Sequence, residues 1–282
     1  MEYYYSQHVI VFTNRLRTNK LMTNSPDDSL STEDRRDQIL TYLNTHDRGY
    51  VADLSQLLNV SEVTVRKDLD FLEAQGLLTR IHGGALASGR GRLELHFGAR
   101  EQQNLDEKRR IAQAAAALIQ SGQRIFLDAS TTALQVARLI KDRKDLIVVT
   151  NGLYTALELV FCEGITTMVL GGTVRPRSSS LVGNLNTDLL RRLRVDLGIF
   201  GAYSVTAQDG LMETDLDEAT LKQSVVNVSS KVVGIADASK FGITSFSVFA
   251  LPEEIDLLIT DTSAPPEMVE SLRAQDVQVV LV

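Results

Sequence analysis

The sequence contains only one cysteine and four histidines, and each scarcity excludes a kind of site. Because a disulfide needs two thiols, Cys162 cannot take part in an internal disulfide framework, and this cysteine usage suits a reducing cytosol. The histidines lie far apart, without the spacing of metal ligands: His8, His46, His82 and His96. We therefore expect a cytoplasmic protein that binds no metal.

Several catalytic and nucleotide-binding motifs are also missing. The sequence has no Walker loop, no G-x-S-x-G nucleophile elbow and no G-x-G-x-x-G fingerprint of a dinucleotide-binding domain. No apolar run approaches the roughly 18 residues that a membrane span requires. We expect no cofactor and no association with a membrane.

Positive charge is in short supply, which is unusual for a protein that binds nucleic acid. The chain has 29 Lys and Arg against 36 Asp and Glu, a net charge of −7, whereas affinity for DNA depends on neutralising phosphates. The basic residues are unevenly spread, because the segment from Gly76 to Arg92 holds arginines and no acid. The net charge therefore leaves DNA binding open, and only a motif can decide it.

The length of the chain, 282 residues, exceeds that of one typical domain, about 100 to 200 residues, so we expect two domains. The composition shifts to Ser, Gly and Arg at residues 88–92, which is typical of an exposed connector. The predicted divisions are a disordered leader over 1–30 with a candidate start at Met22, a DNA-binding domain over 31–88, a linker over 89–104 and an α/β domain over 105–282.

The apolar pattern of the N-terminal part predicts three short helices and a hairpin. Ser61 is a suitable N-cap for the third helix, and Gly83-Gly84 suits the turn of the hairpin. Three helices followed by a hairpin are typical of a winged helix-turn-helix. The expected elements are helices over Arg35–Leu43, Ala52–Leu58 and Glu62–Gln75 and strands over Leu77–Ile81 and Ala85–Ala87.

The third predicted helix offers a polar face for reading DNA. Burial of Val65, Leu69 and Leu72 would turn the opposite side chains outward. An outward arginine can bind a guanine with two N–H groups, whereas Lys, Ser and Thr suit phosphates. The pattern is equally compatible with an ordinary solvated helix, because acids share it: Glu62, Asp68, Asp70 and Glu73. The candidate DNA-binding residues of helix and wing are Ser61, Thr64, Arg66, Lys67, Arg80 and His82.

Beyond the connector, apolar β-branched runs alternate with amphipathic helices. This alternation predicts an α/β domain with a mainly parallel sheet that helices cover on both faces. The expected strands are Arg124–Leu127, Leu146–Val149, Thr167–Leu170, Leu197–Phe200, Val232–Ala236, Leu257–Thr260 and Val277–Leu281. The expected helices are Asp106–Gln120, Thr132–Ile140, Leu153–Phe161, Thr187–Leu193, Glu218–Ser229 and Glu267–Ala274.

The first three of these strands end in small polar residues, which favours a ligand site. Ligands of open α/β sheets bind beyond the carboxyl ends of strands. The run Asp128–Thr132 also leads straight into a helix, whose free N–H groups attract anions. Helix capping without a ligand is the alternative for this run. The candidate effector residues at the three ends are Asp128, Ser130, Thr131, Thr132, Thr150, Asn151, Gly171 and Gly172.

Charged residues later in the chain are further candidates for the effector site. Lys222 follows Glu218 by four residues, so it is either part of an exposed helical ion pair or the cation of the site. Asp237 and Lys240 follow a predicted strand, where an Asp can hold sugar hydroxyls and a Lys a phosphate. With Asp215 these residues complete the candidate effector set.

The runs from Val60 to Leu69 and from Arg80 to Ala85 resemble the signature of the DeoR family of sugar-metabolism regulators. The resemblance implies that the third helix is the recognition helix and that Asp68 braces the fold. It also assigns DNA contact to Ser61, Thr64, Arg66 and Lys67.

The resemblance continues through the α/β domain, over roughly Arg35 to Asp261. It rests there on Leu127–Thr132, Val149–Asn151, Leu170–Gly172, Val182-Gly183, Asp196, Phe200-Gly201, Gly210-Leu211, Glu218, Lys222 and Ala236–Gly242. It implies a sugar-phosphate-sensing domain with a fold similar to ribose-5-phosphate isomerase. Ala129 stands where the family usually has glycine, and its methyl group would narrow the loop and change which ligand fits.

Together these patterns predict a sequence-specific transcription regulator, a repressor of sugar-metabolism genes that a phosphorylated sugar tunes. Because helix-turn-helix proteins usually bind DNA as dimers, we expect a homo-oligomer, dimer or higher, with its interface in the α/β domain. One alternative is an isomerase-like enzyme that uses Asp128, Asp215, Glu218 and Lys222, although nothing positions a carboxylate as a base. The other is a DNA-binding protein without an effector.

Overall fold

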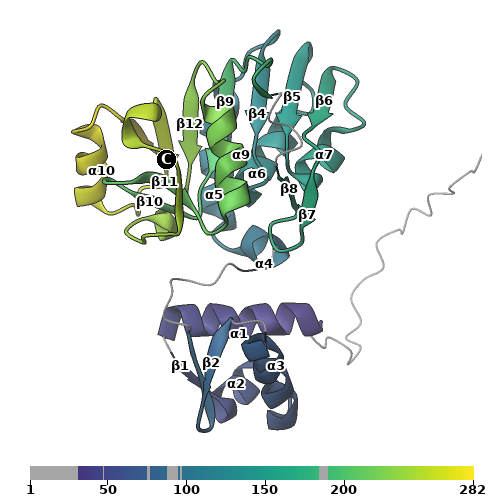
Figure 1. Cartoon of the computed structure of the whole chain (residues 1–282), viewed down its shortest axis with the longest axis vertical. Coiled ribbons are helices and arrows are strands. Elements are labelled where there is room, and N and C mark those ends of the chain that lie inside the picture. The colour runs from purple at the N-terminus through teal and green to yellow at the C-terminus, as the bar shows by residue number, and fades with distance from the viewer. Residues whose placement is uncertain (1–30, 47, 75–76, 88–94, 96, 184–189) are drawn as a thin grey trace, which may run out of the picture.

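The computed structural model describes residues 31–46, 48–74, 77–87, 95, 97–183 and 190–282, as a small N-terminal and a large C-terminal domain (Figure 1). The predicted leader over 1–30, with its candidate start, lies outside the described residues. So do 89–94, the first part of the predicted linker, and residue 88 before them. The second part contains helix α4 (Phe97–Gln102), which the sequence pattern did not predict. The Phe97 ring stacks on that of Tyr154 of the C-terminal domain, with centroids 4.6 Å apart, and Ala99 packs against the core of the N-terminal domain, so α4 contacts both domains.

The N-terminal domain confirms the predicted winged helix-turn-helix. A three-stranded antiparallel sheet in the order β1-β3-β2 packs with three helices. Its first strand, three residues between two helices, was missed because so short a run shows no alternation. The elements are α1 (Thr32–His46), β1 (Arg48–Tyr50), α2 (Val51–Leu58), α3 (Glu62–Ala74), β2 (Leu78–Ile81) and β3 (Gly84–Ala87).

The core of this domain follows the predicted helical stripe, since Val65 and Leu69 are fully buried and Leu72 nearly so. Asp68 lies on the same side of α3 and is 2% exposed. Its carboxylate accepts from Arg35 Nε at 2.6 Å and from Arg36 Nε at 2.9 Å. Asp68 therefore fastens α3 to α1, which confirms the prediction that it braces the fold.

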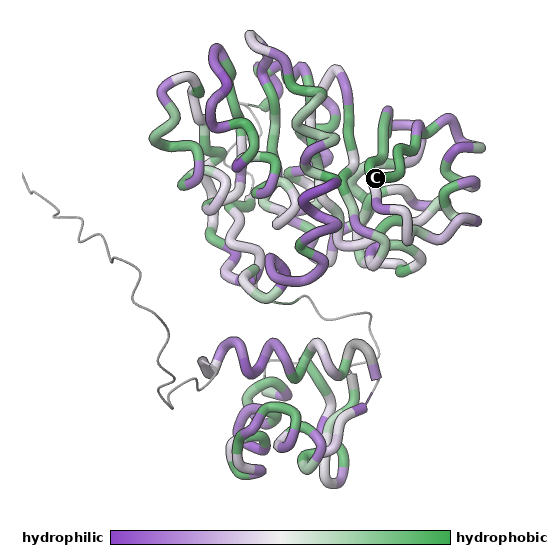
Figure 2. Tube along the Cα trace, turned by 180° about the vertical axis from the view of Figure 1, so that it is seen from behind, coloured by the Kyte–Doolittle hydropathy of each residue, from purple (hydrophilic) through white to green (hydrophobic). Residues whose placement is uncertain are grey.

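The C-terminal domain is built on a seven-stranded sheet in the order β15-β14-β12-β9-β4-β5-β6, in which every neighbouring pair is parallel. The predicted mainly parallel sheet is thereby confirmed, and its strands appear green, or hydrophobic, along much of their length in Figure 2. The strands are β4 (Arg124–Leu127), β5 (Leu146–Thr150), β6 (Ile165–Val169), β9 (Leu197–Gly201), β12 (Val232–Ile235), β14 (Leu257–Thr260) and β15 (Gln278–Leu281).

Helices cover both faces of this sheet. On one face, Ile111 of α5 and Val136 of α6 share a core with Ile125. On the other, Leu221 of α9 packs with Phe126 and its neighbours. The helices are α5 (Leu105–Ala117), α6 (Thr131–Leu139), α7 (Leu153–Leu159), α9 (Leu216–Val226) and α10 (Pro266–Arg273). Of the helix predicted over Thr187–Leu193, residues 187–189 fall outside the described residues; Leu190 is helical, and 191–193 are not.

Two antiparallel additions were not predicted, because their strands are only three or four residues long. One is a sheet of β10 (Ser204–Thr206), β11 (Gly210–Glu213) and β13 (Ser247–Ala250). The other is a hairpin of β7 (Thr173–Arg175) and β8 (Ser180–Val182). Two short 3-10 turns, η2 (Ala238–Lys240) and η3 (Pro252–Glu254), follow β12 and β13.

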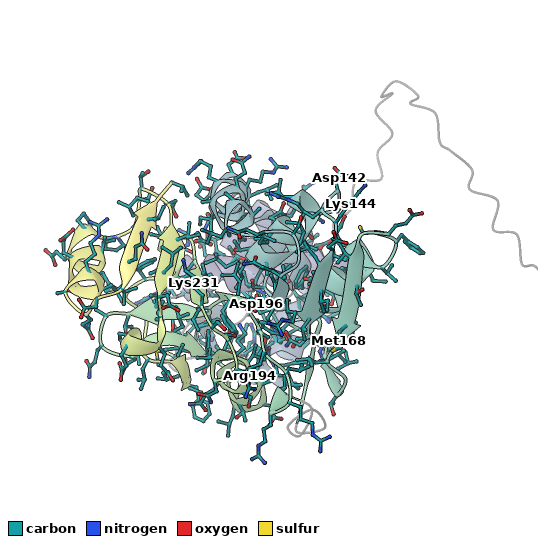
Figure 3. The ribbon with its side chains drawn as sticks, turned by 90° about the horizontal axis from the view of Figure 1, so that it is seen from above. Asp142, Lys144, Met168, Arg194, Asp196 and Lys231 are labelled. Atoms are coloured by element: carbon teal, nitrogen blue, oxygen red, sulfur yellow. The ribbon has the colours of Figure 1, made fainter. Side chains whose placement is uncertain are left out.

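The carboxyl ends of the strands face the DNA-binding domain. Asp196 and Lys231 lead into β9 and β12, and they are visible from above in Figure 3, on the side away from that domain. Helix α4 lies at the opposite edge, where Gln103 just beyond it donates to Thr41 Oγ1 of α1 at 3.4 Å. Any ligand bound beyond the strand ends therefore lies between the sheet and the DNA-binding domain.

Candidate functional site

The outer face of α3 has the polar residues that reading DNA requires. Arg66 and Lys67 are exposed, and the guanidinium-bearing side chain of Arg66 is 51% exposed. Ser61 caps the helix as predicted, since its Oγ accepts from Thr64 N at 3.2 Å and lies 2.9 Å from Thr64 Oγ1. The face is thus preformed, and its contact with DNA stays a prediction.

Two arginines of this region already have partners. Arg66 Nη2 lies 2.5 Å from Glu62, but both side chains are about half exposed and such surface pairs contribute little, so DNA can displace the carboxylate. Arg80 lies 3.2 Å from Asp70 of α3 and donates to Gly84 O at 3.1 Å. Arg80 therefore links the wing to α3, and of the two wing candidates only His82, at the hairpin turn, is fully exposed.

The strand ends of the large sheet converge as predicted. Leu127 pairs with Thr150 on one side and with Ile199 on the other, so the segments that follow β4, β5 and β9 emerge side by side. Ser130 caps α6, because its Oγ accepts from Ala133 N at 3.1 Å. Gly201 makes this close approach possible, since a Cβ there would lie 2.4 Å from the Ser130 side chain.

A buried ion cluster lies behind these strand ends. Lys222 of α9 is 1% exposed, with its Nζ 2.7 Å from Asp128 and 2.5 Å from Glu213. It also donates to Gly201 O at 3.0 Å. Burial alone would lower the pKa of the Lys222 ammonium, but the carboxylates around it raise that pKa above its ordinary value. The interpretation of Lys222 as an exposed helical pair with Glu218 is therefore wrong.

In front of the cluster is a small polar pocket at the protein surface, and the roughly 420 Å³ of empty space around it includes open solvent. Of the candidate effector residues, Ser130, Thr131, Thr132, Asp237 and Lys240 line it. Asp237 is 2% exposed and accepts from Asn104 Nδ2 at 2.9 Å. The pocket thus combines hydroxyls, a carboxylate and the N-terminus of α6.

Three basic residues line this pocket: Arg100, Lys108 and Lys240. Of these, the sequence analysis named Lys240 and missed Arg100 and Lys108. Lys108 of α5 is 4% exposed and donates to the carbonyls of Arg100 and Gln103. Burial lowers the pKa of its ammonium to about 8. No local sequence pattern marks Lys108 as a pocket residue. The segments that complete the pocket around it, at Ser130 and at Asp237, lie more than twenty and more than a hundred residues further along the chain. The sequence showed only that Lys108 lies in the first turn of a predicted helix.

The other candidate effector residues lie apart from the pocket lining. Thr150 and Asn151 are fully buried, and Asn151 Nδ2 donates to Leu181 O of β8 at 3.3 Å. Gly172 approaches the same strand so closely that a Cβ would lie 2.2 Å from Val182 O. Gly171 precedes it, and Asp215 and Glu218 bind Arg175 of the neighbouring hairpin. Their role in effector binding stays a prediction, as does that of Asp128 and Lys222.

Known protein families match both halves of this arrangement. The family model of the DeoR-like helix-turn-helix domain matches residues 35–89, and that of the DeoR C terminal sensor domain matches residues 103–262. The chain belongs to the DeoR family of transcriptional regulators. It is accordingly a DNA-binding transcriptional regulator, and α3 lies within the range that the helix-turn-helix model matches.

Curated relatives match this DeoR-family regulator over most of its length. A putative aga operon transcriptional repressor of Escherichia coli O157:H7 is 35% identical over 89% of this chain and 94% of its own. The regulator GlpR of Haloferax volcanii is 37% identical over 88% and 96%. The glycerol-3-phosphate regulon repressor of Escherichia coli K12 is 30% identical over 83% and 93%.

Solved structures give a weaker likeness. Ribose 5-phosphate isomerase A from Methanocaldococcus jannaschii is 20% identical and covers 54% of this chain and 58% of its own, with a TM-score of 0.38. None of the helices in the described part of the regulator has the length and apolarity that a bilayer span requires. Among the same residues, no three His, Cys, Asp or Glu side chains are grouped as metal ligands would be.

Proposed function

We propose that this regulator represses genes of sugar metabolism and that a phosphorylated sugar, bound in the polar pocket, changes its affinity for operator DNA. The observation that carries the proposal is the meeting of three basic side chains with the capped N-terminus of α6 at the sheet edge facing the DNA-binding domain. The repressor names of the relatives, which refer to the aga operon and the glycerol-3-phosphate regulon, support it.

The phosphate group fits the end of the pocket formed by α6 and η2. Helix N-termini offer free N–H groups to anions, and here Thr131 and Thr132 begin the helix while Ser130 caps it. Lys240 adds a positive charge that is only partly buried. The hydroxyls of a sugar then fit Asp237 and Asn104, which line the same pocket and already share a hydrogen bond.

Lys108 makes effector binding sensitive to pH. Its pKa of about 8 means that part of the population is neutral above that pH, whereas a bound phosphate would favour the charged ammonium. The complex then holds more protons than the free protein, so affinity must fall as pH rises. We expect about a tenfold loss between about pH 7.5 and about pH 9. Calorimetric titration with the effector in buffers of different ionisation enthalpy would detect the proton uptake, and a constant affinity over this range would contradict it.

An isomerase-like activity is less compatible with the same geometry. Asp128 is fully buried and already bound to Lys222, and Glu218 is bound to Arg175. A general base must reach the proton that it removes, and neither carboxylate lines the pocket. We therefore propose that the protein is not an enzyme. Interconversion of pentose or hexose phosphates by the purified protein would refute this.

We also propose that the regulator is a homo-oligomer that works in the cytoplasm, where operator DNA is. Apolar side chains of α7 and its C-terminal end point into solvent, with Leu157 68% and Phe161 91% exposed, beside a groove that α6 and α7 form. Exposed apolar side chains beside a groove with a mixed polar and apolar lining suit a two-fold interface between copies.

The variant Phe161→Glu is therefore expected to shift the protein from dimer towards monomer in sedimentation velocity. A two-fold interface uses the same surface of both copies, so the substitution buries two charges, one from each copy, and weakens the dimer. Phe246→Glu is the matched control, because Phe246 is 75% exposed on a different part of the domain. Unchanged sedimentation of Phe161→Glu would remove α7 from the interface.

The proposed function is tested by thermal-shift measurements with glycerol 3-phosphate, fructose 6-phosphate, galactosamine 6-phosphate and inorganic phosphate. A ligand at a hundred times its Kd stabilises the folded state by about 2.7 kcal/mol. We expect at least one sugar phosphate to stabilise the parent and to do so less in Lys240→Ala. The absence of stabilisation by every compound would favour a regulator without an effector of this class.

A further inference from the structure

The hairpin β7–β8 lies beside α4, at the edge of the sheet that faces the DNA-binding domain (Figure 1). The start of β8 and the last residue of the hairpin loop are tied to the segment that follows β5, because Leu181 N donates to Asn151 O at 2.8 Å and Leu153 N to Ser179 O at 3.0 Å. That loop, residues 176–179, extends from the same edge of the sheet as α4 (Figure 1). The hairpin is thus anchored along the loop end of β8, and Pro176 and Arg177 at the start of its loop lie against the other domain.

Charged contacts at both ends of one turn of α9 join the hairpin to the residues behind the pocket. Arg175 at the end of β7 is 16% exposed; it donates to Glu218 at 2.9 Å and lies 3.3 Å from Asp215. Both carboxylates lie at the N-terminus of α9. One turn further along α9, Lys222 holds Asp128, whose Oδ1 accepts from Ser130 N at 3.0 Å. A ligand that moves Ser130 therefore acts on residues that are only three contacts away from Arg175.

The tip of the hairpin meets a groove on the DNA-binding domain. Pro176 and Arg177 line it from the sensor side, and Glu33 and Asp37 of α1 with Phe71 of α3 are among those that line it from the other. Arg177 of the tip therefore shares one groove with two acids and with Arg36 of α1. Phe71 is 45% exposed and carries the Arg36 guanidinium 3.6 Å above its ring.

The position of this groove matters for DNA reading. Phe71 is part of α3, the helix that carries Arg66 and Lys67 one turn earlier. Arg36 also holds Asp68 of the same helix at 2.9 Å. A segment that docks between α1 and α3 therefore contacts the residues that fix the orientation of the recognition helix.

We propose that the tip of the β7–β8 hairpin, Pro176 and Arg177, is the docking surface by which the sensor domain holds the DNA-binding domain of the same chain. This inference rests on the proposed function, because effector binding is the event that changes the contact between the hairpin tip and the DNA-binding domain. Binding in the pocket changes the contacts of Asp128 and Arg175, the hairpin shifts, and the orientation of α3 changes with it. Couplings of this kind between two sites usually change affinity about 5- to 150-fold.

The first experiment tests the docking without any effector. In the full chain with Cys162→Ser, the pair Glu33→Cys and Arg177→Cys is treated with a short bis-maleimide. We expect a cross-link within one chain, which migrates as a single chain on a denaturing gel and yields a linked peptide pair by mass spectrometry. The control pair Glu33→Cys and Arg143→Cys, with Arg143 at the far edge of the sheet, should give none. Absence of the link, or a link only between two chains, would overturn the proposal.

The second experiment tests the coupling. Gel-shift titrations compare operator affinity with and without the sugar phosphate that stabilises the parent most, for Arg177→Glu and for Arg143→Glu. We expect Arg177→Glu to keep the thermal shift but to reduce the effector-dependent change to less than about 3-fold, and Glu33→Arg with Arg177→Glu to restore it. A parental response of Arg177→Glu, or loss of its thermal shift, would overturn the role of the tip. If no compound affects the parent, the proposed function fails, while the cross-link still decides the docking.

Discussion

Lys222→Met is expected to lower the free energy of unfolding by about 3–5 kcal/mol, because it leaves the carboxylates of Asp128 and Glu213 buried without their cation. Both lie within 2.7 Å of the ammonium that the substitution removes. Urea denaturation followed by circular dichroism measures the change. The matched control is Lys141→Met, whose ion pair with Glu158 is exposed and whose loss should leave stability nearly unchanged.

A second variant distinguishes the destabilisation caused by unpaired buried carboxylates from the destabilisation caused by lost packing. Lys222→Met combined with Asp128→Asn and Glu213→Gln removes the unpaired charges and should recover part of the loss. If Lys222→Met unfolds at the same urea concentration as the parent, the cluster is not the tightly paired unit that its distances indicate.

Arg66→Ala is expected to cost about 1 to 3 kcal/mol of operator affinity, or roughly 5- to 150-fold, while the fold stays intact. The reason is that Arg66 is exposed on α3 and its partner Glu62 can be displaced, so its guanidinium is available to a guanine. Gel-shift titration against operator and unrelated DNA measures both affinity and specificity.

Two controls give this result its meaning. Lys67→Ala should weaken binding to all sequences alike and reduce the salt dependence, as expected for a phosphate contact. Arg109→Ala removes an exposed arginine of α5 in the other domain and should leave operator binding unchanged. Full operator specificity in Arg66→Ala would show that α3 does not read the bases.

Much of the fold was predictable because its elements have strong local patterns. Strand β4 occupies the predicted Arg124–Leu127, and Ser61 caps α3 as its sequence position suggested. The unpredicted parts lack such patterns. Strand β1 has only three residues, and α4 lies in a connector in which Phe97 is the only fully buried side chain of the helix. Its contact with Tyr154 of α7 joins residues that are far apart in the sequence, so no local pattern indicates it.

The candidate site was predictable in its location and not in its details. Because parallel strands end at one edge, the polar runs after β4 and β12 predicted where the pocket lies. Which residues face it depends on long-range packing. Lys222 was visible as a charged residue of a helix, but its burial follows from the approach of β4 and β11. Lys108 entered the pocket from a helix that carried no signal of a ligand.

The account as a whole depends on one link, that phosphate binding in the pocket alters DNA binding. The measurement that tests it most directly is a gel-shift titration of operator DNA with the parent and with Lys240→Ala, each with and without the stabilising sugar phosphate. The account predicts a change in operator affinity of at least about fivefold for the parent and little or none for Lys240→Ala, with equal affinities in the absence of effector. An operator affinity that no sugar phosphate alters in the parent, or an equal response in Lys240→Ala, would contradict it.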